Sequence, residues 1–123
     1  MNKSIKVLIV EDELSILTAI SGKIQEVGWQ SLEAKNGEEG LKLYIAEKPD
    51  VILLDIIMPV MDGIAMLKEL KKLKSKTPVL IFSNLSDQSK VAEALELGSF
   101  NYMIKADNSL DDIVAQIKIM LHK

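Results

Sequence analysis

The sequence predicts an α/β fold: a doubly wound, five-stranded parallel sheet with helices on both faces. Short, apolar, β-branched segments alternate with amphipathic segments five times along the chain. This alternation is typical of parallel strands joined by helical crossovers. With 123 residues and no cysteine, the chain has room for one domain, 1–123, which an apolar core and not disulfide bonds must stabilise.

Five segments are expected to be strands. Two of them, 5–10 and 51–54, are apolar apart from Lys6, the composition of strands that parallel sheets bury on both faces. Polar residues interrupt a third, 29–34, which we therefore place at an edge of the sheet. The remaining strands are expected at 79–82 and 102–104.

The helices expected between these strands are 14–27, 38–47, 64–73 and 87–97. The first has apolar residues three to four positions apart, which form one face of a helix. Gly28 is expected just beyond its end, where left-handed backbone favours glycine. A last helix is expected after Ser109, which forms a capping box with Asp112.

Composition excludes several classes of protein. The chain has 18 acidic and 15 basic residues and a net charge of −3, whereas nucleic-acid binders usually carry a basic excess. The lysines of 68–76 are interpreted as a solvated helix face. No apolar run approaches the roughly 20 residues that cross a bilayer, and the start lacks the apolar region of a signal peptide. We expect a cytoplasmic domain that binds neither membranes nor nucleic acid directly.

Reactive side chains follow the strands at the points where the strands end. Glu11 and Asp12 follow the first strand, Asp55 the third, Ser83 the fourth and Lys105 the fifth. Ligands of doubly wound sheets bind at this edge. Clustered carboxylates repel one another unless a cation lies among them, and oxygen ligands favour Mg²⁺. Such a site suits phosphoryl transfer, and a carboxylate can itself be the nucleophile.

The same residues carry a resemblance to a known family. The acidic pair Glu11-Asp12, the run Asp55-Ile-Ile-Met-Pro-Val-Met-Asp-Gly63, Ser83 and the segment Tyr102–Lys105 resemble the receiver domain of bacterial two-component response regulators, such as the chemotaxis receiver. The likeness covers essentially the whole chain. It implies a flavodoxin-like (βα)5 fold with strand order 2-1-3-4-5 and a role in phosphorelay signalling.

The resemblance also implies a phosphoacceptor and a metal site. Asp55 would accept a phosphoryl group from a histidine kinase or a His-phosphotransfer protein and become an aspartyl phosphate. Asp12, Asp55 and the backbone carbonyl of Ile57 would bind Mg²⁺ directly, and Glu11 would bind it through water.

A switch is implied by the remaining residues of the pattern. Ser83 and Lys105 would contact the phosphoryl oxygens, and Tyr102 would turn inward as Ser83 moves. The surface of helix 87–97, strand 102–104 and the last helix would then change. That surface would bind a downstream protein or effector domain, or form a homodimer.

Four features depart from the family pattern. The acidic pair is Glu11-Asp12 where two aspartates are commoner, and a role through water tolerates the longer Glu. Ala106 follows Lys105 where the family usually has a cis-proline, and a cis bond without proline costs about 2.5–4 kcal/mol, so we predict a trans bond. Asn84 stands where the family usually has a small residue. Ile57 and Leu85 flank the expected path of the hydrolytic water and cannot orient it, which predicts slow self-dephosphorylation.

The leading hypothesis is therefore a signalling switch and not an enzyme, with self-phosphorylation and slow self-dephosphorylation as its only reactions. One alternative is a phosphorylation-independent pseudo-receiver that acts as a protein-interaction module, but both Asp12 and Asp55 are present. Another is a small-ligand binder of flavodoxin type. That function would require a phosphate-binding loop where Glu11-Asp12-Glu13 stands.

Overall fold

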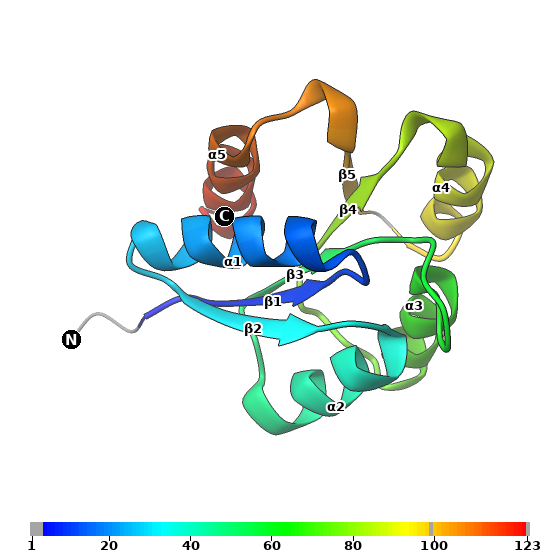
Figure 1. The fold of residues 1–123 in the computed structure, drawn as a ribbon. Helices are drawn as coiled ribbons and strands as arrows, with labels where there is room; N and C mark the ends of the chain where they lie inside the picture. The colour runs from blue at the N-terminus through cyan, green and yellow to red at the C-terminus, as the bar shows by residue number, and fades with distance from the viewer. Residues whose placement is uncertain (1–3, 99, 123) are drawn as a thin grey trace.

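The chain folds into a five-stranded parallel sheet in the order β2-β1-β3-β4-β5 (Figure 1). The structure is a computed structural model, and it describes residues 4–98 and 100–122. The expected fold class, strand order and edge position of the second strand are confirmed.

The elements alternate along the chain without exception. The strands are β1 (Lys6–Val10), β2 (Gln30–Ala34), β3 (Val51–Leu54), β4 (Val79–Ser83) and β5 (Asn101–Ile104). The helices are α1 (Leu14–Glu26), α2 (Gly37–Glu47), α3 (Gly63–Lys72), α4 (Gln88–Leu95) and α5 (Leu110–Leu121), with short 3₁₀ turns η1 (Leu85–Asp87) and η2 (Lys105–Asp107).

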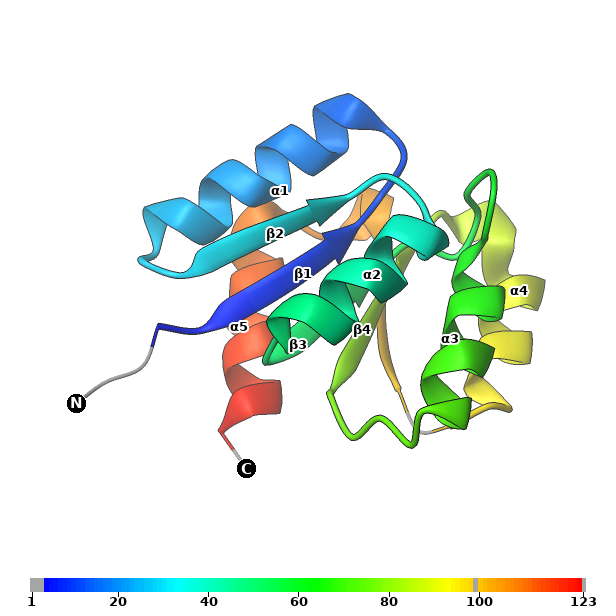
Figure 2. The ribbon, with the colours of Figure 1, turned by 90° about the horizontal axis from the view of Figure 1, so that it is seen from below.

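The sheet separates two apolar layers. Figure 1 shows α1 and α5 on one face, and Figure 2 shows α2, α3 and α4 on the other. Side chains of a strand alternate between faces, so Leu8 and Val10 of β1 pack in the layer of α2, α3 and α4, while Val7 and Ile9 pack in the layer of α1 and α5. All four are at most 1% exposed, and each such aliphatic burial contributes about 1.5–3 kcal/mol.

The helix ends follow the local signals in the sequence. The Ser109 side chain accepts a hydrogen bond from the Asp112 backbone N–H, and the Asp112 carboxylate accepts one from the Ser109 N–H, so the capping box is confirmed. Gly28 has the left-handed φ of 91° expected just beyond α1. Asp62 caps α3 by accepting a hydrogen bond from the Ala65 N–H at 2.9 Å.

The expected helix over 87–97 is wrong at both ends. The turn η1 replaces its first residue, and α4 ends at Leu95. Leu97 continues the apolar spacing, but it packs against the core from the connection that follows the helix, so the same pattern arises from two different elements. The peptide bonds of the described residues are all trans, including Lys105–Ala106, as predicted.

Candidate functional site

Two neighbouring strands bring the carboxylates together. Val10 of β1 pairs with Leu54 of β3, and the Asp55 N–H donates to the Val10 carbonyl at 3.0 Å, so the residues that follow both strands lie at one edge. One oxygen each from Glu11, Asp12 and Asp55 lies within 4.8 Å of the other two. The strand order implied by the family resemblance therefore brings these carboxylates together, as expected.

The three carboxylates differ in their access to solvent. Asp55 is 5% exposed and Glu11 2% exposed, whereas Asp12 is exposed. The Glu11 carboxylate also accepts a hydrogen bond from the Glu13 N–H at 3.0 Å. Three hard oxygen ligands, with one side open to water, fit a divalent cation that keeps part of its water shell.

Lys105 reaches the same cluster from the end of β5. Its Nζ lies 2.8 Å from Glu11 Oε1 and 3.3 Å from Asp55 Oδ2, and its side chain is only 10% exposed. The ammonium also lies 5.8 Å from the centre of the Phe82 ring, a cation–π distance. One cation therefore lies between two buried anions.

Burial and neighbouring charges shift the pKa values of both Asp55 and Lys105. Desolvation and the Glu11 charge raise the pKa of Asp55 to about 7, although Lys105 opposes this shift. Burial lowers the pKa of Lys105, but the hydrogen bond to Glu11 and the charges of Asp55 and Glu11 outweigh that effect, so the pKa is raised overall. Such strong perturbation in a cluster of groups is a mark of functional sites.

Ser83 ends β4 at the same edge of the sheet. Its side chain is fully buried, and its Oγ has no hydrogen-bond partner within the described part of the chain. A buried hydroxyl without a partner costs about 1–3 kcal/mol, and a ligand that accepts a hydrogen bond from Ser83 would remove this cost.

Tyr102 of β5 lies on the same face of the sheet as Ser83. In the sheet, Ser83 pairs with Ile104 and Ile81 pairs with Tyr102. Tyr102 therefore starts on the face of Ser83, and its side chain is 46% exposed.

Backbone hydrogen bonds from two glycines fix the loop between β3 and α3. The Gly63 N–H donates to the Ile56 carbonyl, and the Gly37 N–H donates to the Met61 carbonyl, both at 2.8 Å. A Cβ at Gly63 would lie 2.6 Å from the Asp55 carbonyl oxygen, and one at Gly37 would lie 2.6 Å from the Met61 carbonyl oxygen. Only glycine fits this close to the backbone.

Three exposed apolar residues lie in the loops that follow β3 and β4. Ile57, whose N–H donates to Asp55 Oδ1 at 3.3 Å, is 45% exposed, and Leu85 is 65% exposed. Val60 is 78% exposed and has a left-handed φ of 67°, which is rare and strained for a β-branched residue.

Most of the residues expected in the site are gathered there. Glu11, Asp12 and Asp55 lie together, and Lys105 contacts Glu11 and Asp55. The contact of Lys105 with Phe82 was missed. The one signal for it was the alternation along β4, which turns Phe82 toward the layer of α1 and α5.

Ligands of doubly wound sheets bind at the carboxyl edge, and the acid cluster and buried lysine found there suit phosphoryl-transfer chemistry. The chain belongs to the response regulator receiver domain family, whose model matches residues 7–118. It is therefore a domain of two-component phosphorelay signalling. None of the helices in 4–98 and 100–122 combines the length and apolar character needed to cross a bilayer.

Curated relatives extend over the whole chain. It is 37% identical over 123 residues to the alkaline phosphatase synthesis transcriptional regulatory protein PhoP of Bacillus subtilis, covering 100% of this chain and 50% of that protein. It is 36% identical over 118 residues to the probable transcriptional regulator ycf27 of Guillardia theta, covering 96% of this chain and 46% of that protein. The chain thus spans about half the length of the curated relatives it matches.

Solved structures agree with the fold. The receiver domain of the Francisella response regulator 1452 superposes with a TM-score of 0.85 and 36% identity, covering 96% of this chain and 97% of that one. The chemotaxis protein CheY4 of Vibrio cholerae superposes with a TM-score of 0.86 and 26% identity, covering 95% of this chain and 98% of that one.

Proposed function

We propose that Asp55 is the phosphoacceptor of this receiver domain. The observation that carries the proposal is the pairing of a buried carboxylate with a buried ammonium, 3.3 Å apart, beside two further carboxylates. A carboxylate oxygen of Asp55 attacks the phosphorus, an O–P bond forms, and the P–N bond of a phosphohistidine breaks with its electron pair leaving on the imidazole nitrogen.

Asp12, Asp55 and the Ile57 carbonyl would hold Mg²⁺, with Glu11 acting through water. The clustered carboxylate oxygens support this assignment because Mg²⁺ requires hard oxygen ligands and keeps several waters. When bound, the ion supplies charge neutralisation for the carboxylates and the transferred group.

Lys105 and Ser83 would hold the phosphoryl group once it is attached. The Lys105 ammonium already contacts Asp55, so it is within reach of oxygens attached to that carboxylate. The Ser83 hydroxyl has no other partner among the described residues and can donate to a phosphoryl oxygen. Three new acceptor oxygens and a charge of about −1.5 to −2 favour both contacts.

Movement of Ser83 toward the phosphoryl group would let Tyr102 turn inward. The two residues share a face of the sheet, and the Tyr102 side chain is 46% exposed, so burial does not fix its orientation. The surface of α4, β5 and α5 would then present a different shape to a downstream protein, an effector domain or a second copy of the chain. Such a switch needs two states within a few kcal/mol.

A histidine kinase or His-phosphotransfer protein would be the physiological donor. Ile57, Val60 and Leu85, in the loops that follow β3 and β4, are exposed, and a protein donor docked at this edge would remove apolar surface from water. A pseudo-receiver would need no acceptor or metal ligands, so their convergence favours the phosphorylated switch.

The direct test is incubation with acetyl phosphate and Mg²⁺ followed by intact-mass measurement. We expect a gain of one phosphoryl group in the native protein and none in Asp55→Ala. EDTA should abolish the gain. A protein that gains no phosphoryl group from any donor, although it is folded, would be an interaction module instead.

A further inference from the structure

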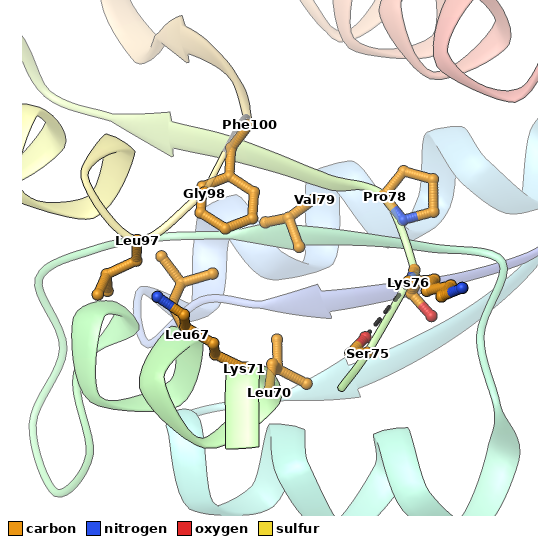
Figure 3. A pocket seen from close by; sticks show the side chains of 11 residues that line it. Leu67, Leu70, Lys71, Ser75, Lys76, Pro78, Val79, Leu97, Gly98 and Phe100 are labelled. Carbon is orange, nitrogen blue, oxygen red and sulfur yellow. Dashed lines mark hydrogen bonds between the residues drawn. The ribbon is translucent and has the colours of Figure 1, made fainter. Parts of the chain in front are cut away.

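A pocket of about 300 Å³ opens at the end of the sheet opposite the acid cluster (Figure 3). Leu67 and Leu70 of α3, Val79 at the start of β4 and Phe100 before β5 line its apolar floor. Val79 and Ser83 are the two ends of β4, so about 13 Å of strand separates the pocket from the phosphorylation site. None of the reactions proposed above uses this pocket.

Two exposed lysines stand at the rim. Figure 3 shows Lys71 extended toward Leu97 and Lys76 on the opposite side, beside Pro78. Residues 68–76 contain five lysines and one glutamate, in a chain whose net charge is −3. Five of the chain's 15 basic residues thus lie in this short segment, and two of them border the apolar pocket.

Helix ends alone do not account for this charge. The helix dipole favours cations in the last turn, where Lys71 and Lys72 lie. Lys74 and Lys76 lie beyond the helix. Lys72 pairs with Glu69 at 3.1 Å, and no other lysine of 68–76 has an ion pair among the described residues.

Lys74 stands where glycine is usual. The Ser75 N–H donates to the Leu70 carbonyl and the Lys74 N–H to the Lys71 carbonyl, both at 3.0 Å, which is the hydrogen-bond pattern of a helix ending in a left-handed residue. Lys74 has that left-handed φ, 55°. The chain thus keeps an ammonium at a position where glycine would be less strained.

We propose that this pocket binds an acidic segment of a partner protein through one large apolar side chain. The floor can bury a single aromatic or branched side chain, and the flanking carboxylates meet the lysines of the rim. Local positive potential would also speed the encounter with an acidic partner. Nucleic acid is a poorer fit because the chain has no arginine, the residue that pairs with phosphates in a bidentate manner.

The test uses a fluorescent peptide with one tryptophan flanked by glutamates and measures anisotropy at about 50 mM salt, where surface charges are weakly screened. We expect micromolar binding. The double variant Lys71→Glu/Lys76→Glu should weaken binding at least about tenfold. The matched control Lys42→Glu/Lys90→Glu changes the charge equally at two exposed helix lysines elsewhere and should bind like the native protein.

A second peptide with glycine in place of tryptophan tests the pocket without altering the protein, and it should bind at least about tenfold more weakly. Equal weakening by both double variants, or equal affinity for both peptides, would overturn the proposal. So would displacement of the peptide by duplex DNA or by phosphatidylglycerol vesicles at lower concentration. Asp55→Asn should bind the peptide unchanged, so this proposal and the phosphoacceptor role fail or stand separately.

Discussion

The two ends of the sheet use charge in opposite ways. At the carboxyl edge, Glu11 and Asp55 are at most 5% exposed and share Lys105, whose side chain is 10% exposed. At the amino edge, Lys71 and Lys76 are exposed and only rim an apolar pocket. A charge removed from water is coupled to stability and to the state of its partners, whereas a solvated charge acts mainly on encounter.

Substituting one lysine at each end gives the largest expected contrast. Lys105→Met leaves two buried carboxylates without their cation and should lower the free energy of unfolding by about 3 kcal/mol in EDTA. Lys71→Met should change it by at most about 0.5 kcal/mol. Urea unfolding measures both.

Millimolar Mg²⁺ should recover more stability in Lys105→Met than in the native protein, because the ion binds the carboxylates that the lysine neutralised. If Lys105→Met and Lys71→Met lowered the free energy of unfolding equally, the contrast between buried and solvated charge would be wrong.

Removing the buried acid should have the next largest effect. The pKa of Asp55 is about 7 against an ordinary 3.8, so the folded state holds this proton more tightly than the unfolded chain. Stability contributed by the protonated acid is present below about pH 4 and is lost as the pH rises to about 7. Asp55→Asn has no such loss.

The variant should therefore gain stability relative to the native protein as the pH rises through this window, and it should stay the more stable of the two above it. Urea titrations at several pH values in EDTA measure the difference. A constant difference between pH 4 and 8 would show that burial does not control this carboxyl group.

Much of the fold follows from local patterns. The strand 51–54 was predicted with its observed bounds because all four residues are buried and the chain leaves the sheet at Asp55. The end of α4 was not, because Leu97 has the spacing of a helix residue while it lines the pocket from a connection. The spacing of apolar residues indicates which side chains are buried, but a helix and an irregular connection can both bury the same side chain.

The site was predictable in its members but not in its contacts. Strand ends bring Glu11, Asp12 and Asp55 together in any parallel sheet of this order. That Lys105 contacts both Glu11 and Asp55, and that Ser83 is left without a partner among the described residues, depends on side-chain packing across strands distant in sequence. No local pattern encodes those distances.

A third change alters the carboxyl edge without altering its charge. Ile57 is exposed beside Asp55 and offers no group that could orient a water. Ile57→Asn adds a donor and an acceptor there, and one hydrogen bond of about 1 kcal/mol corresponds to about fivefold faster loss of the phosphoryl group.

Decay of the intact-mass signal after removal of acetyl phosphate measures this rate. Lys71→Asn at the opposite edge is the matched control and should leave the decay unchanged. An unaltered lifetime in Ile57→Asn would show that water access is not limited at this position.

The smallest effects are expected from relieving backbone strain at the two ends of the sheet. Val60 at the carboxyl edge and Lys74 at the amino edge both have left-handed φ values, 67° and 55°. Glycine relieves that strain but increases the entropy of the unfolded chain. Because a β-branched side chain is the more strained in this region, Val60→Gly should stabilise by about 1 kcal/mol and Lys74→Gly by about half as much. Val60 is 78% exposed, so little packing is lost.

Urea unfolding measures both values, provided that the dependence of stability on denaturant is unchanged. If Val60→Gly were destabilised, the surrounding loop and not Val60 itself would set this backbone conformation.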